Sequence, residues 1–238
     1  MALVALNQVS KNYQMGELSV QALKNIEIEI DEQTFVSIVG PSGSGKTTLL
    51  NLIGCLDKPS SGEVFVNGTA VNNYTNKQAA LFRGQHLGFI FQNFNLLPVL
   101  TAYENVEYPL IMVQNIPANE RKERIMRYLE EVGMADQKDK YPSQLSGGQK
   151  QRIAVARALV TDPKLVLADE PTANLDHASA FKVIELMRQM QQDFKTTFIF
   201  STHDPKIVKE AEIIYTLEDG EIVDKKIVAS NNHDKEVE

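Results

Sequence analysis

The stretch GPSGSGKT at residues 40–47 decides the fold class of this chain. A short apolar run, TFVSIV at 34–39, precedes it, and an apolar helix-like segment, TTLLNLIGCL at 47–56, continues from its last residue. This order of strand, glycine-rich turn and helix is the context in which G-x-x-x-x-G-K-[ST] forms a phosphate-binding loop. The alternative, a glycine-rich turn with an exposed lysine, is disfavoured by that context. We therefore expect an α/β fold that carries the loop after a buried strand.

Each residue type in this loop suits the binding of phosphate. The glycines let backbone N–H groups turn toward one point without a Cβ atom in the way, and the start of the helix adds to the anion site. Lys46 can place a compact positive charge against the β and γ phosphates of a nucleotide, and the Thr47 hydroxyl can ligate Mg²⁺. The predicted nucleotide-binding residues here are Gly40, Pro41, Ser42, Gly43, Ser44, Gly45, Lys46, Thr47 and Thr48.

A second stretch, KLVLADEPT at 164–172, places two carboxylates at the end of another apolar run. Ligands of open α/β sheets collect at the carboxyl ends of the strands, so Asp169 and Glu170 are expected beside the loop. Asp169 is suited to hold Mg²⁺ through water, and Glu170 can orient or deprotonate an attacking water molecule. Alone, this pattern also describes a solvated strand end. Paired with the loop, it predicts a hydrolytic site.

Two further polar residues follow strand-like runs. His203 comes after TTFIFST at 196–202, in a strand expected beside the one that carries Glu170, where it would face the γ-phosphate as a hydrogen-bond donor. Gln92 ends LGFIFQ at 87–92, and its amide could reach the metal or its water if the next segment rotates inward. A surface histidine and a solvated glutamine are the alternatives. The predicted catalytic residues are Lys46, Gln92, Glu170 and His203, and the predicted metal ligands are Thr47, Gln92 and Asp169.

Composition excludes some classes of protein and disfavours others. The 238 residues carry a net charge of −7 with a pI of about 5.2, which argues against a nucleic-acid binder. The single cysteine, Cys55, cannot form an internal disulfide and is expected to be a buried thiol. No run reaches the ~18 apolar residues of a membrane span, and the N-terminus lacks the features of a secretory signal. We expect a soluble cytoplasmic domain whose work at a membrane would need a partner.

Strand-like and helix-like segments alternate along the chain. NIEIEI at 25–30 has period-two alternation and GEVFVNGTAV at 62–71 predicts a hairpin at Asn67-Gly68, so an antiparallel layer is expected near the N-terminus. Amphipathic helices are expected at 120–133, 150–160 and 179–192. We predict a single domain over 1–226, with a core at 1–92 and 164–226, a helical subdomain inserted at about 93–163, and a polar tail at 227–238.

The segment LSGGQKQR at 145–152 contains no carboxylate, histidine or cysteine, yet an apolar-periodic run follows it. Its serine and adjacent glycines are suited to open a helix with exposed backbone N–H groups. Such a segment can meet an anion through the positive end of the helix dipole.

Over about residues 2–225 the chain resembles the nucleotide-binding subunits of ATP-binding-cassette (ABC) transporters. GPSGSGKT resembles their Walker A loop, Gln92 their Q-loop, LSGGQ their signature and LVLADE their Walker B strand. ANLD at 173–176 resembles the D-loop and His203 the switch histidine. Tyr13, in SKNYQMG, resembles the aromatic residue that stacks on adenine; a tyrosine that only packs in the fold is the alternative.

The resemblance implies a P-loop NTPase core of the RecA-like type, ATP and Mg²⁺ as cofactors, and hydrolysis of ATP to ADP and phosphate. It also implies a head-to-tail homodimer in which one copy's signature, Ser146, Gly147, Gly148 and Gln149, covers the nucleotide held by the other. Asn174 and Asp176 are then expected across the dimer seam.

Three longer stretches, LIGCLDKPSSGEV, FIFQNFNLLPVLTAYENVEYPL and LADEPTANLD, resemble the lipoprotein-releasing and macrolide-export subgroup. This similarity implies an integral membrane permease at the cytoplasmic face of the membrane, and no nucleic-acid partner. The permease is expected to dock near Phe94–Tyr103, where Phe94, Leu96, Leu97, Leu100 and Tyr103 crowd ten residues around Pro98. Packing of these five side chains within the helical subdomain is the alternative. An ABC ATPase that acts on nucleic acid or ribosomes, and one that signals to cell-wall machinery without moving cargo, are the alternative functions.

Overall fold

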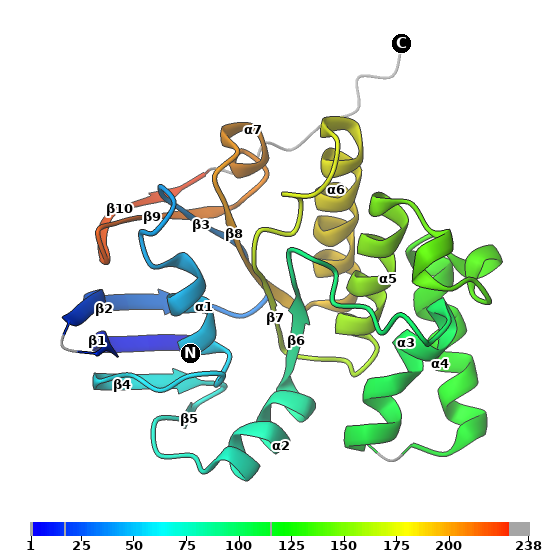
Figure 1. The fold of residues 1–238 in the computed structure, drawn as a ribbon, viewed down its shortest axis with the longest axis horizontal. Coiled ribbons are helices and arrows are strands. Elements are labelled where there is room, and N and C mark those ends of the chain that lie inside the picture. Colours follow the sequence, from blue (N-terminus) through cyan, green and yellow to red (C-terminus); the bar gives the residue numbers. More distant parts are fainter. Residues whose placement is uncertain (1, 17, 115, 229–238) are drawn as a thin grey trace.

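A computed structural model describes residues 2–16, 18–114 and 116–228 of the chain. A six-stranded sheet crosses its middle in the order β10-β9-β3-β8-β7-β6 (Figure 1). The five strands from β9 to β6 are parallel, and β10 is an antiparallel edge. The strands are β3 (Phe35–Val39), β6 (Leu87–Ile90), β7 (Leu165–Ala168), β8 (Thr197–Thr202), β9 (Ile213–Glu218) and β10 (Glu221–Ile227). Every residue of β7 and β8 is buried, which confirms the prediction of strands covered on both faces.

The N-terminal part forms a separate antiparallel sheet in the order β2-β1-β4-β5. Its strands are β1 (Val4–Met15), β2 (Leu18–Ile30), β4 (Ser61–Val66) and β5 (Thr69–Ala70). In β2 the isoleucines at 26, 28 and 30 are buried, as the alternating sequence predicts. Asn67 and Gly68 join β4 to β5 with φ angles of 51° and 70°, the positive values that a tight hairpin turn needs.

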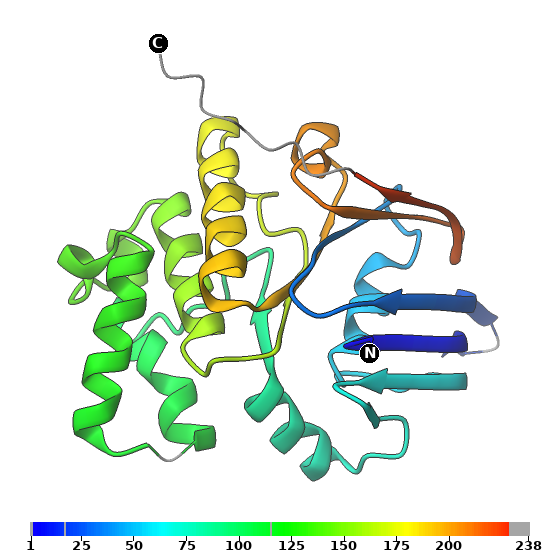
Figure 2. The same ribbon diagram turned by 180° about the vertical axis from the view of Figure 1, so that it is seen from behind.

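The helices lie mainly on the other side of the six-stranded sheet from the antiparallel sheet, as both views show (Figure 2). The predicted insert contains three α-helices, which are α3 (Ala102–Pro109), α4 (Ala118–Glu131) and α5 (Gly147–Leu159). A π-helical turn (Leu110–Gln114) continues α3, and short 3₁₀ turns lie at Ala135–Gln137 and Pro142–Gln144. The others are α1 (Lys46–Ile53), α2 (Asn76–His86), α6 (His177–Phe194) and α7 (Pro205–Val208).

Each face of the parallel sheet packs into its own hydrophobic core. Val36 and Ile38 point into a core shared with α1 and the antiparallel sheet, whereas Phe35 and the neighbouring Phe198 and Phe200 point into a core shared with α3 to α6. The mixed α/β fold class is therefore confirmed. Whether 93–163 behaves as a separate subdomain stays a prediction, and most of the predicted tail, 229–238, lies outside the described residues.

None of the helices in the described ranges is long and apolar enough to cross a membrane. Cys55 is buried, as predicted, and burial raises the pKa of its thiol to about 11.

Asn105 of α3 is fully buried and organises the loop that precedes its helix. Its Oδ1 accepts from the backbone N–H of Leu97 at 2.8 Å. Its Nδ2 donates to the carbonyls of Leu97, Leu100 and Thr101 at 2.9–3.1 Å. One side chain thus replaces the secondary structure that residues 97–101 lack.

We predict that Asn105→Ala destabilises the protein by about 1–3 kcal/mol, because several buried backbone groups lose their partner at once. Urea unfolding followed by circular dichroism measures this change. Asn73→Ala, at an exposed turn residue, serves as the control and is expected to stay within about 0.5 kcal/mol of the parent. An Asn105→Ala midpoint equal to that of the control would contradict the role given to the amide.

Candidate functional site

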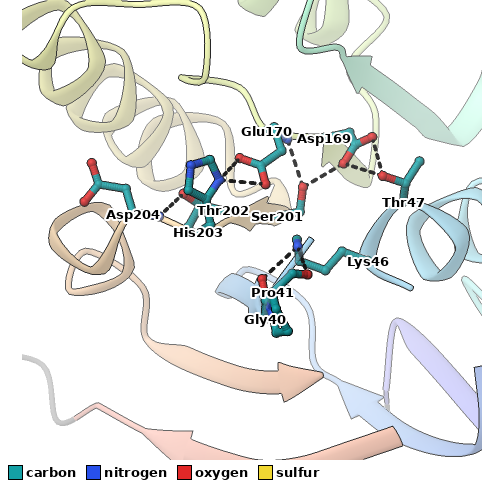
Figure 3. A network of polar contacts seen from close by, with 10 residues as sticks. All are labelled: Gly40, Pro41, Lys46, Thr47, Asp169, Glu170, Ser201, Thr202, His203 and Asp204. Atoms are coloured by element: carbon teal, nitrogen blue, oxygen red, sulfur yellow. Dashed lines mark hydrogen bonds and ion pairs between the residues drawn. The ribbon is translucent and has the colours of Figure 1, made fainter. Parts of the chain in front are cut away.

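The glycine-rich loop joins β3 to α1 and folds around the ammonium group of Lys46. The Nζ atom donates to the backbone carbonyls of Gly40 and Pro41, at 2.8 and 2.9 Å (Figure 3). Only 8% of Lys46 is exposed. Gly45 has φ 107°, and a Cβ atom there would lie 2.6 Å from the carbonyl oxygen of Ala22. The loop therefore needs glycine for its backbone conformation and for the close approach of β2.

Asp169 leaves the end of β7 and meets α1, as predicted. The Thr47 hydroxyl donates to its carboxylate, with 2.9 Å to Oδ2 and 3.2 Å to Oδ1. Ser201 of β8 donates from its hydroxyl to Oδ1 of Asp169 at 2.7 Å, and accepts the backbone N–H of Glu170 at 2.8 Å. Sequence reasoning missed Ser201. Its only signal was a polar residue at the end of the apolar run TTFIFS, two residues before the predicted His203.

Glu170 and His203 are brought together by the pairing of β7 with β8. The His203 Nδ1 atom lies 3.0 and 3.1 Å from the two carboxylate oxygens of Glu170 (Figure 3). Glu170 has φ 46°, in the left-handed region that non-glycine residues rarely occupy. The backbone conformation of Glu170 and its contact with His203 thus fix the direction of the side chain that is predicted to act on water.

A cleft of about 900 Å³, a size that suits a small-molecule ligand, is lined by nine of the predicted site residues. The predicted residues that line it are Ser42, Gly43, Gly45, Lys46, Thr47, Thr48, Gln92, Glu170 and His203. The rest of the lining comprises Ala173, which begins the predicted D-loop, and residues that sequence reasoning missed, namely Val20, Gln21, Ala22, Lys24, Asp219 and Gly220. Tyr13 does not line the cleft, but in the sheet register it lies directly opposite Val20, which does.

The second half of the predicted site lies apart from this cleft. Ser146 caps α5: its hydroxyl accepts the N–H of Gln149, and the Gln149 side chain accepts the N–H of Ser146 in return. This capping box leaves the N–H groups of Gly147 and Gly148, the first two of the helix, without a partner inside the helix. A different hollow, of about 270 Å³, is lined by Ser146, Gly148 and Gln149 together with Arg152, Ser179 and Lys182 among others.

The two predicted dimer-seam residues each have a partner within the chain. Asn174 donates from Nδ2 to the carbonyl of Gln92 at 2.9 Å and to Oδ1 of Asn93 at 2.8 Å. Asp176 caps α6 by accepting the backbone N–H of Ser179 at 3.0 Å, and hydrogen bonding with Ser179 lowers the pKa of this carboxyl group. Contact with a second copy stays a prediction for both residues.

A smaller groove of about 260 Å³ borders the predicted docking segment. Asn95, Tyr108, Pro109 and Arg157 line it together with residues of α2 and β6. Of the five apolar residues predicted to dock a partner (Phe94, Leu96, Leu97, Leu100 and Tyr103), only Leu97 is exposed, and Leu96 and Tyr103 pack against the helical core. The exposed apolar side chains nearby include Val99, Tyr108, Ile111 and Met112.

Arg157 holds the backbone at the edge of this groove. Its guanidinium donates to the carbonyls of Phe94 and Asn95 at 2.7 and 2.5 Å, and burial lowers the pKa of Arg157 to about 10. Phe94 and Asn95 have φ angles of 61° and 46°. The arginine therefore satisfies two carbonyls in a strained turn just after Gln92.

Comparison with known proteins places this geometry in a family. The family model described as "ABC transporter" matches residues 23–173. An uncharacterized ABC transporter ATP-binding protein of Methanocaldococcus jannaschii, MJ0796, is 45% identical over 92% of this chain and 95% of its own length. Its solved structure, described as a dimeric post-hydrolysis state of the ATP-binding cassette bound to ADP and Pi, matches with a TM-score of 0.88, at 42% identity over 95% of this chain and 99% of that one.

Two relatives carry more specific names. The lipoprotein-releasing system ATP-binding protein LolD of Francisella tularensis is 43% identical over 92% of this chain and 95% of its own. The macrolide export ATP-binding/permease protein MacB of Syntrophobacter fumaroxidans is 42% identical over 93% of this chain, which spans only 31% of that longer protein. From these matches and the geometry above, the chain belongs to the ABC transporter family.

Proposed function

We propose that this protein is an ATPase subunit that closes as a homodimer around two ATP molecules and drives an integral membrane partner. The observation that best supports this is the division of the site into two parts. The cleft supplies Lys46, Glu170 and His203, whereas the cap of α5 opens a helix elsewhere and leaves two N–H groups for an anion. A second copy placed head to tail would bring the missing part. The relative MJ0796 was solved as a dimer with ADP and phosphate.

Each group in the cleft has a chemical part in this proposal. When ATP binds, the ammonium of Lys46 would exchange its hydrogen bonds to neutral carbonyls for hydrogen bonds to the β and γ phosphates. The phosphates are the stronger acceptors because they are negatively charged. Glu170 would orient a water molecule and accept its proton as that water attacks the γ-phosphorus and the bond to ADP breaks. His203 would position Glu170 and donate to the γ-phosphate. Tyr13 would stack on adenine.

The residues present also fit Mg²⁺. The Thr47 hydroxyl and the Asp169 carboxylate form a close pair of hard oxygen donors, the type this ion prefers. Among the described residues no group of three His, Cys, Asp or Glu could hold a metal alone, so phosphate and water oxygens would complete the shell. Bound there, the ion would neutralise charge on the β and γ phosphates. Gln92, in the cleft lining, is the third proposed ligand.

The membrane partner would dock at the groove beside 94–103, which is lined by Arg157 and by the exposed side chain of Tyr108. LolD and MacB are named for lipoprotein release and for macrolide export with a permease. We therefore place this chain with subunits of that type, at the cytoplasmic face of the membrane that holds the permease. The acidic net charge gives no support to a nucleic-acid partner.

Replacing the proposed base separates binding from hydrolysis. Glu170→Gln is expected to keep ATP affinity, to lose at least about a hundredfold in turnover, and to accumulate as an ATP-bound dimer. Size-exclusion chromatography with ATP and a phosphate-release assay measure these effects. Glu27→Gln, on the exposed face of β2, is the control and should behave as the parent. Parent-like turnover in Glu170→Gln would remove the carboxylate from its proposed role.

A site shared between two copies makes turnover depend on concentration. Turnover per subunit is expected to rise with protein concentration until dimers saturate, because a monomer holds ATP without the α5 cap above it. Steady-state assays across a dilution series measure this. Ser146→Arg should bind ATP as the parent does but stay near the dilute-monomer rate throughout. A flat profile for the parent protein, from dilute monomer upward, would rule out the composite site.

Metal dependence tests the Asp169 assignment. Chelation of divalent ions with EDTA is expected to stop turnover, and Asp169→Asn should raise the Mg²⁺ concentration for half-maximal turnover by about 10-fold or more. Magnesium titrations at saturating ATP measure both, with Asp193→Asn on the exposed side of α6 as the control. If Asp169→Asn and the control give the same magnesium curve, Asp169 does not hold the ion.

A further inference from the structure

Tyr13 is hydrogen-bonded to Asp57, a residue that follows helix α1. Its hydroxyl donates to Oδ2 of Asp57 at 2.8 Å. Asp57 lies in the loop after α1, the helix that begins at Lys46. Oδ1 of the same carboxylate accepts from Lys11 Nζ and from the backbone N–H of Lys58, both at 2.7 Å. Both oxygens of Asp57 therefore have partners, and one of those partners is the tyrosine.

Lys11 closes the cluster from above the ring. Its ammonium lies 4.8 Å from the Tyr13 ring centroid, and donates to the Lys58 carbonyl at 2.8 Å as well as to Asp57. Its side chain is only 12% exposed. An ammonium over one face of the ring is a favourable cation–π contact. It also covers that face, so that a nucleotide base has to stack on the other one.

The charge state of this cluster supports the geometry. Burial alone would raise the pKa of Asp57, but the hydrogen bonds from Lys11 and Tyr13 outweigh it and lower that pKa below its ordinary value. Burial, followed by the bond to Asp57, raises the pKa of Tyr13. At neutral pH the pair is therefore a phenol that donates and a carboxylate that accepts.

Further backbone contacts fix the loop of Asp57 to the same strand. Ser60 accepts the N–H of Asn12 on its hydroxyl at 3.0 Å, and donates its own N–H to the carbonyl of Ser10 at 2.8 Å. Helix α1 leads from this loop back to the phosphate-binding residues within eight residues. The ring of Tyr13 and the phosphate loop are thus connected through one short helix and one carboxylate.

We propose that Asp57, held by Lys11, is a positioning residue that fixes the Tyr13 ring as the platform for the base of a nucleoside triphosphate. This inference rests on the proposed function, because it takes the cleft to bind ATP. A stacking surface reads the flat face of a base and not its hydrogen-bonding edge, so the platform accepts adenine and guanine alike. A triphosphate without a base gains nothing from it.

Isothermal titration calorimetry with ATP, GTP and inorganic tripolyphosphate, at fixed Mg²⁺, tests this proposal. Tyr13→Ala is expected to weaken the binding of both nucleotides by about 10-fold or more, the size of a lost base stack. Asp57→Ala and Tyr13→Phe should each weaken it by about threefold to tenfold. The double variant Tyr13→Phe with Asp57→Ala should be no weaker than Asp57→Ala alone, because removal of the carboxylate already removes the hydrogen bond of the Tyr13 hydroxyl. Tripolyphosphate affinity should stay unchanged in all four.

Asp139→Ala is the matched control, since Asp139 is also paired with a lysine, Lys138, but is 83% exposed and away from the cleft. It should bind all three ligands as the parent does. Parent-like ATP affinity in Asp57→Ala and Tyr13→Phe, with a loss only in Tyr13→Ala, would overturn the positioning role and leave the proposed function intact. Equal losses for ATP and tripolyphosphate in Asp57→Ala would reveal a disturbed phosphate loop and overturn it too. A parent protein that binds none of the three ligands would overturn both proposals.

Discussion

A buried positive charge must be surrounded by oxygen atoms, and Lys46 imposes this condition on the middle of the molecule. Its ammonium is met by two neutral backbone carbonyls of its own loop. Carbonyls satisfy the hydrogen bonds of a cation without cancelling its charge, so the positive potential of the loop and of α1 stays available to an anion. The nearby carboxylates are held by other partners, Asp169 by Thr47 and Ser201, and Glu170 by His203.

The strand order brings Lys46 and these carboxylates to one place. Because β3 lies next to β8, and β8 next to β7, the carboxyl ends of these three parallel strands meet at one edge of the sheet. Asp169 and His203 directly follow their strands, and Lys46 begins α1 after the loop that follows β3, so the three residues meet there from distant parts of the sequence. The buried strands thus hold the residues of the cleft in place. One hydrophobic core packs against each face of the sheet and fixes the positions of these strands.

Much of this was readable from the sequence, because the relevant signals are local. The alternation in β2, the Asn67-Gly68 turn and the place of the glycine-rich loop between a strand and a helix each depend on a few adjacent residues, and all three were confirmed. The residues that sequence reasoning missed act through partners far along the chain. Ser201 reaches Asp169, 32 residues away, and Asp57 reaches Tyr13 at a separation of 44. Such pairs depend on strand register and on loop placement, which no local pattern in the sequence encodes.

The loop after Gln92 shows how the two parts of the proposed function could be joined. Asn174, four residues after Glu170, donates to the carbonyl of Gln92, a residue that lines the cleft. Arg157, on the helix that begins at the signature, holds the next turn from the side of the groove, where the backbone is strained. A partner that presses into the groove would therefore move a turn that is hydrogen-bonded both to the loop after β7, which carries Glu170, and to helix α5, which begins at the signature. Strained residues change conformation at a lower cost than relaxed ones, so this turn is where we expect docking and ATP hydrolysis to influence each other.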